Sequence, residues 1–466
     1  MPTNPSIFKA YDIRGVYKKD LDEKTAYSLG LAYIKLRLQD LKNIKKPTLS
    51  NKRQEKKLKI VVSSDMRLSS PPLKKYLIKG LLDGGADVID IGINSTPTFY
   101  FAVAKYKYDG GIMVSASHNP KEWNGFKMTR ERAIPISGNS GIDFLKKEII
   151  NNDLKSVKNK GKLSKKKNVL QDQIKYDLKH GAPKKIKPFK IVADPANAVG
   201  GLFITELFKH LSCKLIKINF KLDGSFPSHE ADPIKDENLK QIKKEVLKQK
   251  ADLGITTDGD GDRIFFIDDK GSLIDQSIIR GLLAKLFLRE KPGSKIGFDV
   301  RPGKITEDLI LENKGKPTKT RVGHSLIKEQ MLKDNIYFSG ESSGHFFLNM
   351  EIGCFEVPNI VILKLLEEFS KDIKPVSEQI KKYKKYFHSG EINREVKDKE
   401  KVFKLLEKEF NKGKINKLDG LSIAFPDFWF NVRGSNTENK MRLNLEAINK
   451  ETMEKMKNKI LKIIEK

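Results

Sequence analysis

Short apolar, β-branched segments alternate with amphipathic helical stretches along most of this chain, and this alternation limits the possible folds more than any other feature. The apolar segments fall into three groups, at residues 58–116, 189–258 and 294–340. Strand and helix patterns in alternation predict βαβ units and largely parallel sheets. The sequence therefore predicts three α/β domains in succession.

The last part of the chain follows a different pattern. After residue 379, strand-like segments at 422–435 and 440–447 are flanked by charged helices. This arrangement predicts a small α+β domain. We expect four domains, at residues 1–154, 155–272, 273–378 and 379–466.

Lysine dominates the composition of the surface. The chain of 466 residues has a formal net charge of +30, and 38% of its residues are hydrophobic, enough for several cores. A polyanionic partner and a solvated lysine-rich surface would both explain the charge. The densest lysine patches, at 45–59 and 155–167, contain no aromatic residue. They are typical of a loop insertion and a linker, so we expect no nucleic-acid partner.

The cysteines and the apolar runs indicate a cytoplasmic protein. Cys213 and Cys354 are far apart and outside any CxxC pattern, which argues against a disulfide framework or a zinc site. The N-terminus has no apolar targeting segment, and no apolar run approaches the roughly 18 residues that span a bilayer. We therefore expect no membrane partner.

A serine and a histidine are adjacent in the stretch GIMVSASHNPKEWNGFK, residues 111–127. Ser117 is a weak nucleophile unless a base or a metal activates it. Neighbouring side chains in an extended segment point to opposite faces, so we expect His118 to order the loop and not to act as the base for Ser117. Ser117 does not stand in the hydrolase pattern GxSxG, because Ser115 and Asn119 occupy the two glycine positions. Taken alone, the stretch could also be an ordinary strand-to-turn junction.

Three aspartates alternate with glycines in TTDGDGDR, residues 256–263. Asp258, Asp260 and Asp262 would repel one another unless a cation joined them. An EF-hand loop is excluded because Arg263 stands where that loop needs glycine and Asp269 where it needs glutamate. The pattern predicts a Mg²⁺ site with room for a phosphoryl oxygen, in preference to a solvated acidic turn.

Two further stretches have the composition of anion and sugar sites. RGSNTENK, residues 433–440, combines a guanidinium, hydroxyls and amides that could hold a phosphate. In GESSGH, residues 340–345, Glu341 and Ser343 could bind sugar hydroxyls and His345 could move a proton. Each stretch could equally be a polar turn.

Together these stretches resemble the α-D-phosphohexomutase superfamily, and within it the phosphomannomutase/phosphoglucomutase branch. The resemblance covers nearly the whole chain and rests on YDIRG, DMRLSS, SASHNPKEWNGFK, DGSFPSHEADPIKDENL, DGDGDR, VGHSLIK, GESSGH and RGSNTE, in that order. It implies three similar α/β domains with mixed sheets and a smaller C-terminal α+β domain, arranged around one central cleft.

The resemblance also implies roles for individual residues. It identifies Ser117 as a phosphoserine, and its oxygen would join Asp258, Asp260 and Asp262 in holding Mg²⁺. The remaining catalytic candidates, with proton transfer assigned first to the lysine and the histidine, are Lys127, His345 and Arg14. The substrate-binding residues would be Tyr11, Arg263, Arg301, His324, Glu341, Ser343, Arg433, Ser435, Asn436 and Thr437.

The implied reaction interconverts hexose 1-phosphate and hexose 6-phosphate, with mannose or glucose as the sugar. It passes through a hexose 1,6-bisphosphate, which would also act as activator. Three alternatives remain: a phosphoglucosamine mutase, a metal-dependent phosphatase on the same scaffold, and a nucleic-acid-binding protein on a retired one. The chain departs from the family in having Asn439 where proline is usual, and Arg301 where some members have lysine. Small-molecule sugar phosphates are the expected partners, and the protein would be a monomer or a small homo-oligomer.

Overall fold

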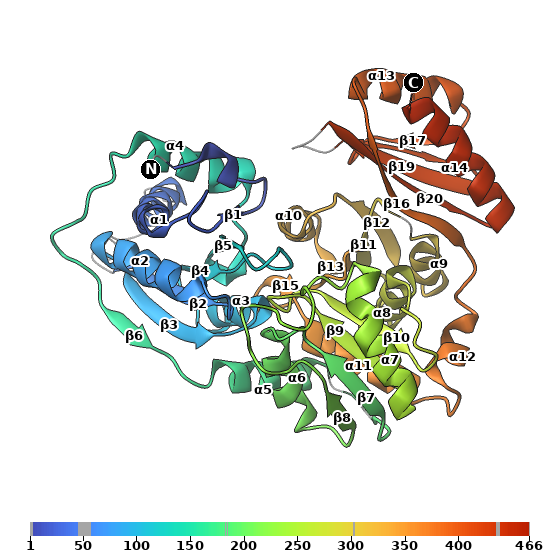
Figure 1. Cartoon of the computed structure of the whole chain (residues 1–466), viewed down its shortest axis with the longest axis horizontal. Coiled ribbons are helices and arrows are strands. Elements are labelled where there is room, and N and C mark those ends of the chain that lie inside the picture. Colours follow the sequence, from blue (N-terminus) through green and yellow to red (C-terminus); the bar gives the residue numbers. More distant parts are fainter. Residues whose placement is uncertain are drawn as a thin grey trace.

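Four β-sheets follow one another along the chain in a computed structural model that describes residues 3–44, 57–181, 183, 185–301, 303–434 and 439–465. The sheets lie along an arc, with the N-terminal and C-terminal parts at its two ends (Figure 1). The first three sheets are mixed and covered by helices, and the fourth is antiparallel. This confirms the predicted fold class.

The first sheet has the strand order β1-β5-β4-β2-β3-β6. Its parallel part consists of β4, β2, β3 and β6, whereas β1 and β5 pair antiparallel at one side. The strands are β1 (Ile13–Val16), β2 (Lys59–Ser64), β3 (Asp87–Ile93), β4 (Gly110–Val114), β5 (Trp123–Arg130) and β6 (Leu163–Lys165). The helices are α1 (Glu23–Ile44), α2 (Ser70–Asp83), α3 (Thr96–Lys105) and α4 (Asp143–Asn151).

The second sheet has the order β10-β9-β7-β8, and only β10 runs antiparallel to its neighbour. The strands are β7 (Lys190–Asp194), β8 (Lys214–Lys217), β9 (Leu253–Thr257) and β10 (Ile264–Asp268). The helices are α5 (Val169–Gly181), α6 (Gly200–Phe208) and α7 (Lys240–Gln249). All five residues of β9 are buried, as expected for a central strand that ends at the aspartate loop.

The third sheet has the order β12-β11-β13-β14-β15, with parallel pairs at one side and antiparallel pairs at the other. The strands are β11 (Lys295–Asp299), β12 (Lys316–Thr320), β13 (Ile336–Gly340), β14 (Phe346–Asn349) and β15 (Cys354–Glu356). The helices are α8 (Gln276–Glu290), α9 (Lys304–Glu312), α10 (His324–Asp334) and α11 (Pro358–Phe369).

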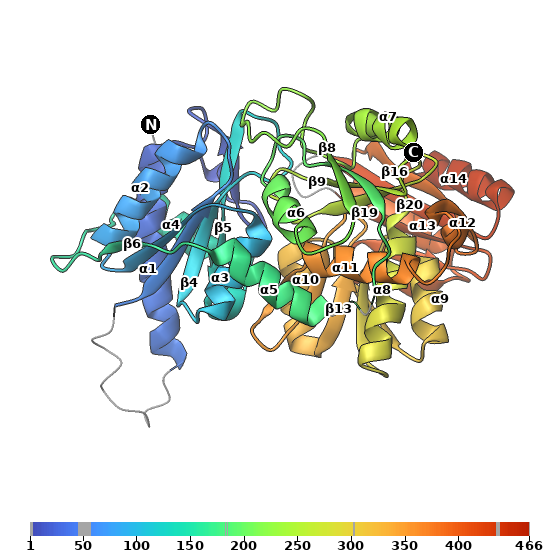
Figure 2. The ribbon, with the colours of Figure 1, turned by 90° about the horizontal axis from the view of Figure 1, so that it is seen from below.

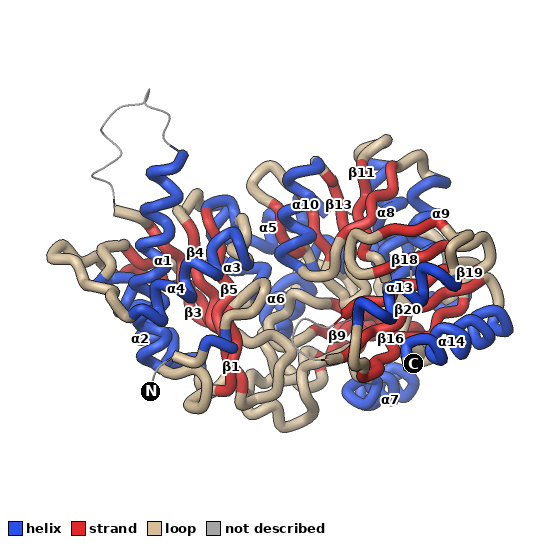
Figure 3. Tube along the Cα trace, turned by 90° about the horizontal axis from the view of Figure 1, so that it is seen from above, coloured by secondary structure: helices blue, strands red, loops and turns tan. Residues whose placement is uncertain are grey.

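The fourth sheet is an antiparallel meander with an outer strand, in the order β16-β20-β19-β18-β17. The strands are β16 (Phe387–Glu395), β17 (Lys414–Asn416), β18 (Leu421–Ala424), β19 (Phe428–Gly434) and β20 (Lys440–Ala447). The helices in and before this part are α12 (Val376–Lys381), α13 (Lys399–Glu409) and α14 (Lys450–Ile464), and Figure 3 shows α13 and α14 beside the sheet. The stretch 422–435, expected to be strand-like, forms parts of two strands because Phe425–Asp427 turn the chain back.

The hydrophobic cores join some parts of the molecule and separate others. One continuous cluster joins α3 of the first part to several strands and helices of both the second and the third sheet. In Figure 2, α5 and α11 lie together, and a buried hydrogen bond of 2.8 Å joins Asn359 Nδ2 on α11 to Asp177 Oδ2 on α5. The fourth sheet has a cluster of its own. The C-terminal part is therefore packed as a separate unit.

The structure describes only part of the two lysine-rich patches at 45–59 and 155–167. Residues 45–56 lie outside the described residues. The patch at 155–167 is not a linker throughout, because Leu163–Lys165 form β6 and pair with β3. Within the described ranges, no helix is both long enough and apolar enough to cross a bilayer.

Candidate active site

The serine loop begins where the buried strand β4 ends. Ser117 is 1% exposed, and its Oγ lies 2.6 Å from Asp258 Oδ2 of the second sheet's aspartate loop. Its φ of +54° is in the left-handed region, which few non-glycine residues adopt. Such strain is typical of functional positions that the surrounding structure holds in place.

The backbone conformation of Ser117 corrects one expectation about its neighbour. His118 was expected to point away from Ser117, as in an extended segment. Because the backbone of Ser117 is in the left-handed region, the His118 side chain lies on the same side as Ser117. Its Nδ1 is 3.3 Å from Ser117 Oγ. Burial lowers the pKa of His118 well below its usual range, so its imidazole is neutral.

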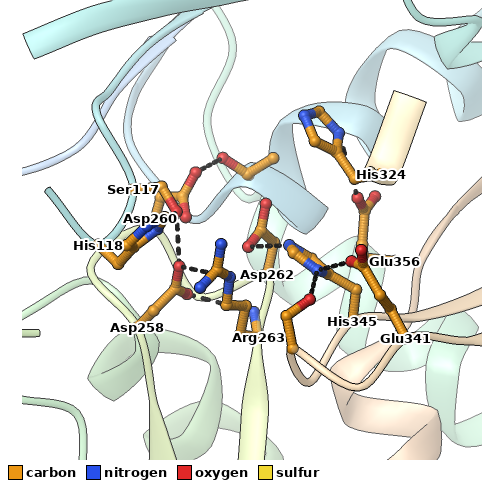
Figure 4. A network of polar contacts seen from close by, with 12 residues as sticks. Ser117, His118, Asp258, Asp260, Asp262, Arg263, His324, Glu341, His345 and Glu356 are labelled. Atoms are coloured by element: carbon orange, nitrogen blue, oxygen red, sulfur yellow. Dashed lines mark hydrogen bonds and ion pairs between the residues drawn. The ribbon is translucent and has the colours of Figure 1, made fainter. Parts of the chain in front are cut away.

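The three predicted metal ligands meet at one point. Asp258, Asp260 and Asp262 are buried, and they offer carboxylate oxygens that lie within 4.8 Å of one another (Figure 4). Asp260 Oδ1 is buried and accepts no hydrogen bond from any described residue. A converging set of hard oxygen donors with an unpaired buried oxygen fits Mg²⁺.

The electrostatics of this triad show how strongly it needs positive charge. Burial, with Asp262 and Asp260 nearby, raises the pKa of Asp258 to about 8. Lys127 Nζ lies 2.6 Å from Asp260 Oδ2 and 2.5 Å from Asp262 Oδ2. Burial alone would lower the pKa of Lys127, but these carboxylates outweigh it and raise the pKa, so the ammonium stays charged.

His345 connects the aspartate loop with the loop after β13. Its Nε2 lies 3.1 Å from Asp262 Oδ1, and its Nδ1 lies 2.7 Å from Glu341 Oε2 and 3.1 Å from Ser343 Oγ (Figure 4). Burial disfavours the imidazolium, but Asp262 and Glu341 outweigh that effect and raise the pKa of His345 to about 9. The ring is therefore a positively charged imidazolium at neutral pH. Burial would raise the pKa of Glu341, yet His345 and Arg301 lower it to about 2.

Cationic and aromatic side chains surround this centre. Arg14 donates through Nη1 to Asn119 Oδ1 at 2.6 Å and through Nε to Asp12. Arg263 has its Nε 3.9 Å from Asp258 Oδ2, and its Nε and Nη1 are buried without a hydrogen-bond acceptor among the described residues. Buried, unpaired guanidinium nitrogens indicate a place prepared for an anion.

Tyr11 and His324 come from opposite sides of the site. Their rings are 6.1 Å apart, and the Tyr11 ring packs so closely on Gly323 that a Cβ there would lie 2.9 Å from it. His324 Nε2 is buried and has no hydrogen-bond partner in the described part of the chain. The first and third parts therefore meet at the site, with an unsatisfied imidazole nitrogen between them.

The remaining predicted substrate residues lie farther along the arc. Arg301 Nη2 is 2.6 Å from Asp299 Oδ2 and 3.3 Å from Glu341 Oε1. Arg433, on β19, has its Nη2 3.0 Å from Glu391 Oε2. Ser435, Asn436 and Thr437 lie outside the described residues.

Sequence analysis missed residues that support the site. Thr96 donates from Oγ1 to Asp260 Oδ2 at 2.6 Å and from its backbone N to Asp260 O at 2.9 Å. It stands directly after a parallel strand, where ligand sites gather in α/β folds, and that position was the available signal. Asp299 binds Arg301 and also accepts from Ser342 N and Oγ, so it fixes the loop that carries Glu341 and Ser343. No motif pointed to it.

Models of known protein families match four successive segments of the chain. All four carry the description phosphoglucomutase/phosphomannomutase. The α/β/α domains I, II and III match residues 5–154, 164–271 and 275–386, and the C-terminal domain matches residues 391–463.

Individual proteins give the same result. A phosphomannomutase of Methanocaldococcus jannaschii is 39% identical over 463 residues, which is 98% of each chain. A phosphomannomutase/phosphoglucomutase of Pseudomonas aeruginosa is 34% identical over 98% of this chain and 95% of its own. A crystal structure of a phosphoglucomutase/phosphomannomutase family protein from Burkholderia thailandensis superimposes with a TM-score of 0.85 at 30% identity, over 99% of this chain and 97% of the other.

Proposed function

Since this chain belongs to the phosphoglucomutase/phosphomannomutase family of enzymes, we propose that it interconverts the 1-phosphates and 6-phosphates of mannose and glucose, with Ser117 as the phosphoryl carrier. The observation that carries the proposal is the 2.6 Å approach of Ser117 Oγ to Asp258 in a buried acidic triad.

Asp258, Asp260 and Asp262 would hold Mg²⁺ together with an oxygen of phosphorylated Ser117. Bound there, the ion would neutralise negative charge on the transferring phosphoryl group. The donor set supports this assignment because all three side chains are hard oxygen ligands. The residues of the chain would orient the substrate, exclude water and supply the remaining positive charge.

In the first half-reaction, a sugar hydroxyl oxygen forms a bond to phosphorus as the bond between phosphorus and Ser117 Oγ breaks. The hydroxyl gives up its proton as it bonds to phosphorus, and Ser117 Oγ gains a proton as the phosphoryl group leaves it, so no net proton is released. Lys127 and His345 both lie against Asp262 and both carry a proton to donate at neutral pH. We assign proton transfer to this pair: one of them donates to Ser117 Oγ, and the base so formed accepts the proton of the sugar hydroxyl. Arg14 would fix the serine loop through Asn119 and present its charge to the phosphoryl group.

The second half-reaction needs the bisphosphate to turn round in the site. Arg433, with Ser435, Asn436 and Thr437, would hold the phosphate that is not reacting, and Glu341 and Ser343 would bind sugar hydroxyls. Tyr11, Arg263, Arg301 and His324 would line the space in which it turns. Free hexose 1,6-bisphosphate would then activate the enzyme by rephosphorylating Ser117. The proposal includes a cytoplasmic location and a monomer or small homo-oligomer.

The test compares the parent with Ser117→Ala and with Ser63→Ala, a buried serine whose hydroxyl donates to Gly92 O at 3.0 Å away from the aspartates. Isomer formation from glucose 1-phosphate and mannose 1-phosphate is measured beside release of inorganic phosphate. We expect isomerisation with little phosphate release in the parent and in Ser63→Ala, and neither in Ser117→Ala. Phosphate release without isomer would identify a phosphatase, and full activity of Ser117→Ala would reject the serine carrier.

Sugar choice is tested with the same assay on glucosamine 1-phosphate. We expect kcat/KM to be larger for mannose and glucose phosphates than for glucosamine phosphate. The reverse order would identify a phosphoglucosamine mutase while leaving the phosphoserine chemistry intact.

A further inference from the structure

Arg67 uses every hydrogen-bond donor of its guanidinium on the serine loop and its base. The side chain is 0% exposed. A guanidinium has five N–H donors in a fixed planar fork. The five acceptors are Ser117 O at 2.8 Å, Asn119 O at 2.6 Å, Pro120 O at 2.6 Å, Trp123 O at 3.1 Å and Asp65 Oδ2 at 3.2 Å.

These acceptors determine the path of the backbone around Ser117. Four of the five are main-chain carbonyls in the segment 117–123, which therefore bends around one planar cation. Ser117 is left-handed at φ +54°, a conformation that costs free energy unless the surroundings hold it. Arg67 supplies that hold, since its bond to Ser117 O acts on the strained residue itself.

A segment of the second domain closes over the guanidinium. The Phe226 ring centre lies 5.0 Å from Arg67 Cζ, and Phe226 is also left-handed, at φ +50°. A bulky residue in that conformation is a marked outlier. Gly224 lies so close that a Cβ there would be 2.5 Å from Met66 O and 2.7 Å from Arg67 Cα. Met66 and Phe226 share one apolar cluster.

We propose that Arg67 is a positioning residue that holds Ser117 in line with the aspartate loop, and that Phe226 holds Arg67 in place when the second domain docks. The inference rests on the proposed function, in which Ser117 Oγ carries the phosphoryl group. The domain that supplies the aspartates thus also fixes the support of the serine. Arg67 itself does not touch the reacting atoms, since its donors end on carbonyls and on Asp65.

Three variants test this role. Arg67→Lys keeps the charge but has three donors in place of a planar fork of five. Phe226→Leu keeps an apolar side chain but removes the aromatic face. The control is Arg37→Lys, because Arg37 is also buried in the first domain and also donates to a main-chain carbonyl, that of Asp109, away from the serine.

The kinetic result separates positioning from general loss of stability. A misplacement of about 1 Å costs on the order of 100-fold in rate. We expect kcat of Arg67→Lys to fall by about that factor with little change in KM. The kcat of Phe226→Leu should also fall, but by a smaller factor. The ³¹P resonance of the phosphoserine should shift in both variants. Arg37→Lys should keep the parent's kcat and resonance, and an equal loss of kcat in this control would overturn the proposal.

A second measurement is independent of the reaction. Amide hydrogen exchange in the segment 115–124 of the unphosphorylated chain should be faster in Arg67→Lys and Phe226→Leu than in the parent and in Arg37→Lys. Unchanged exchange there refutes the positioning role even if kcat falls. Mass spectrometry of the parent distinguishes the other failure: a parent that never carries phosphate on Ser117 refutes the proposed function, while the exchange result still decides the role of Arg67.

Discussion

At the residue scale, the site depends on side chains whose neighbours decide their charge. Asp258, Asp260 and Asp262 have the same chemistry, yet only Asp258 faces Ser117, and Lys127 lies against the other two. The spacing of the aspartates in the sequence was enough to predict a cation site. It could not indicate which carboxylate receives the serine, because that depends on contacts between residues more than a hundred positions apart.

Thr96→Val should weaken Mg²⁺ binding by about 10–100-fold, as loss of an outer hydrogen bond to a metal ligand commonly does. Valine keeps the shape of threonine but cannot donate to Asp260 Oδ2. Binding of Mg²⁺ is measured directly by titration calorimetry. The control is Thr98→Val, two residues along α3, whose hydroxyl donates to Gln173 Oε1. Equal affinities in the two variants would contradict the role assigned to Thr96.

Asp177 gives a pH dependence of stability. Burial raises its pKa to about 7 from 3.8, although Asn359 and Gln173 oppose the shift. The folded protein therefore holds this proton more tightly than the unfolded chain, and the free energy of unfolding falls as pH rises from about 4 to 7. The full loss above pH 7 is on the order of 4 kcal/mol.

Asp177→Asn should remove this loss, because an amide cannot ionise. We expect the variant to have a higher urea midpoint than the parent at pH 8 and a similar one at pH 4. Asp153→Asn, at an exposed position, is the control and should follow the parent at every pH. A parent-like fall in the midpoint of Asp177→Asn between pH 5 and pH 8 would show that another group is responsible.

At the element scale, two loops at the carboxyl ends of β4 and β9 meet backbone to backbone. Most strands were foreseeable because buried parallel strands are short, continuous apolar runs, as in Leu253–Thr257. Strand β16 was missed because its burial alternates weakly and it carries His388, Asn393 and Arg394, which do not form an apolar pattern. The meeting of the loops was expected only from the family resemblance, since no local pattern encodes how two domains dock.

Gly259→Ala should separate the two loops. A Cβ at this position would lie 2.4 Å from Ser117 O, and a backbone atom cannot move aside by changing rotamer. We expect kcat to fall by roughly 100-fold, because Ser117 would move away from Asp258. Gly138→Ala is the control, since its nearest neighbour would be an ordinary contact at 3.7 Å. Steady-state kinetics decide the outcome, and comparable activity of both variants would argue against close docking.

At the scale of the whole molecule, the C-terminal part carries Arg433, a proposed phosphate-binding residue, but has its own core. Polar contacts join it to the third part: Asp419 Oδ2 accepts from Val322 N at 2.8 Å, and Glu446 Oε2 accepts from Gly303 N at 3.0 Å. The predicted succession of three α/β parts and one α+β part is confirmed as a fold class. The contacts of Asp419 and Glu446 with the third part could be learned only from the assembled chain.

Arg433→Ala should weaken the binding of both substrates, the 1-phosphate and the 6-phosphate. Loss of a charge-assisted contact to phosphate costs roughly 1.5–3 kcal/mol, so KM should rise about 10–100-fold for the 1-phosphate and the 6-phosphate alike. Free bisphosphate should accumulate, and added bisphosphate should be needed for full activity. The control is Arg394→Ala, an exposed arginine on β16 paired with Glu465. An effect on one substrate alone would contradict a shared phosphate site.

The placement of the serine and its aspartates on different domains has a consequence during synthesis. Ser117 leaves the ribosome first, and its partner Asp258 follows 141 residues later. At ordinary elongation rates this interval lasts about 10–30 s, while N-terminal domains fold before later ones are complete. During that time the hydroxyl has no carboxylate beside it and no phenyl ring over Arg67. We therefore expect the nascent domain to be catalytically silent, and the chain to become reactive only when the second domain folds against the first.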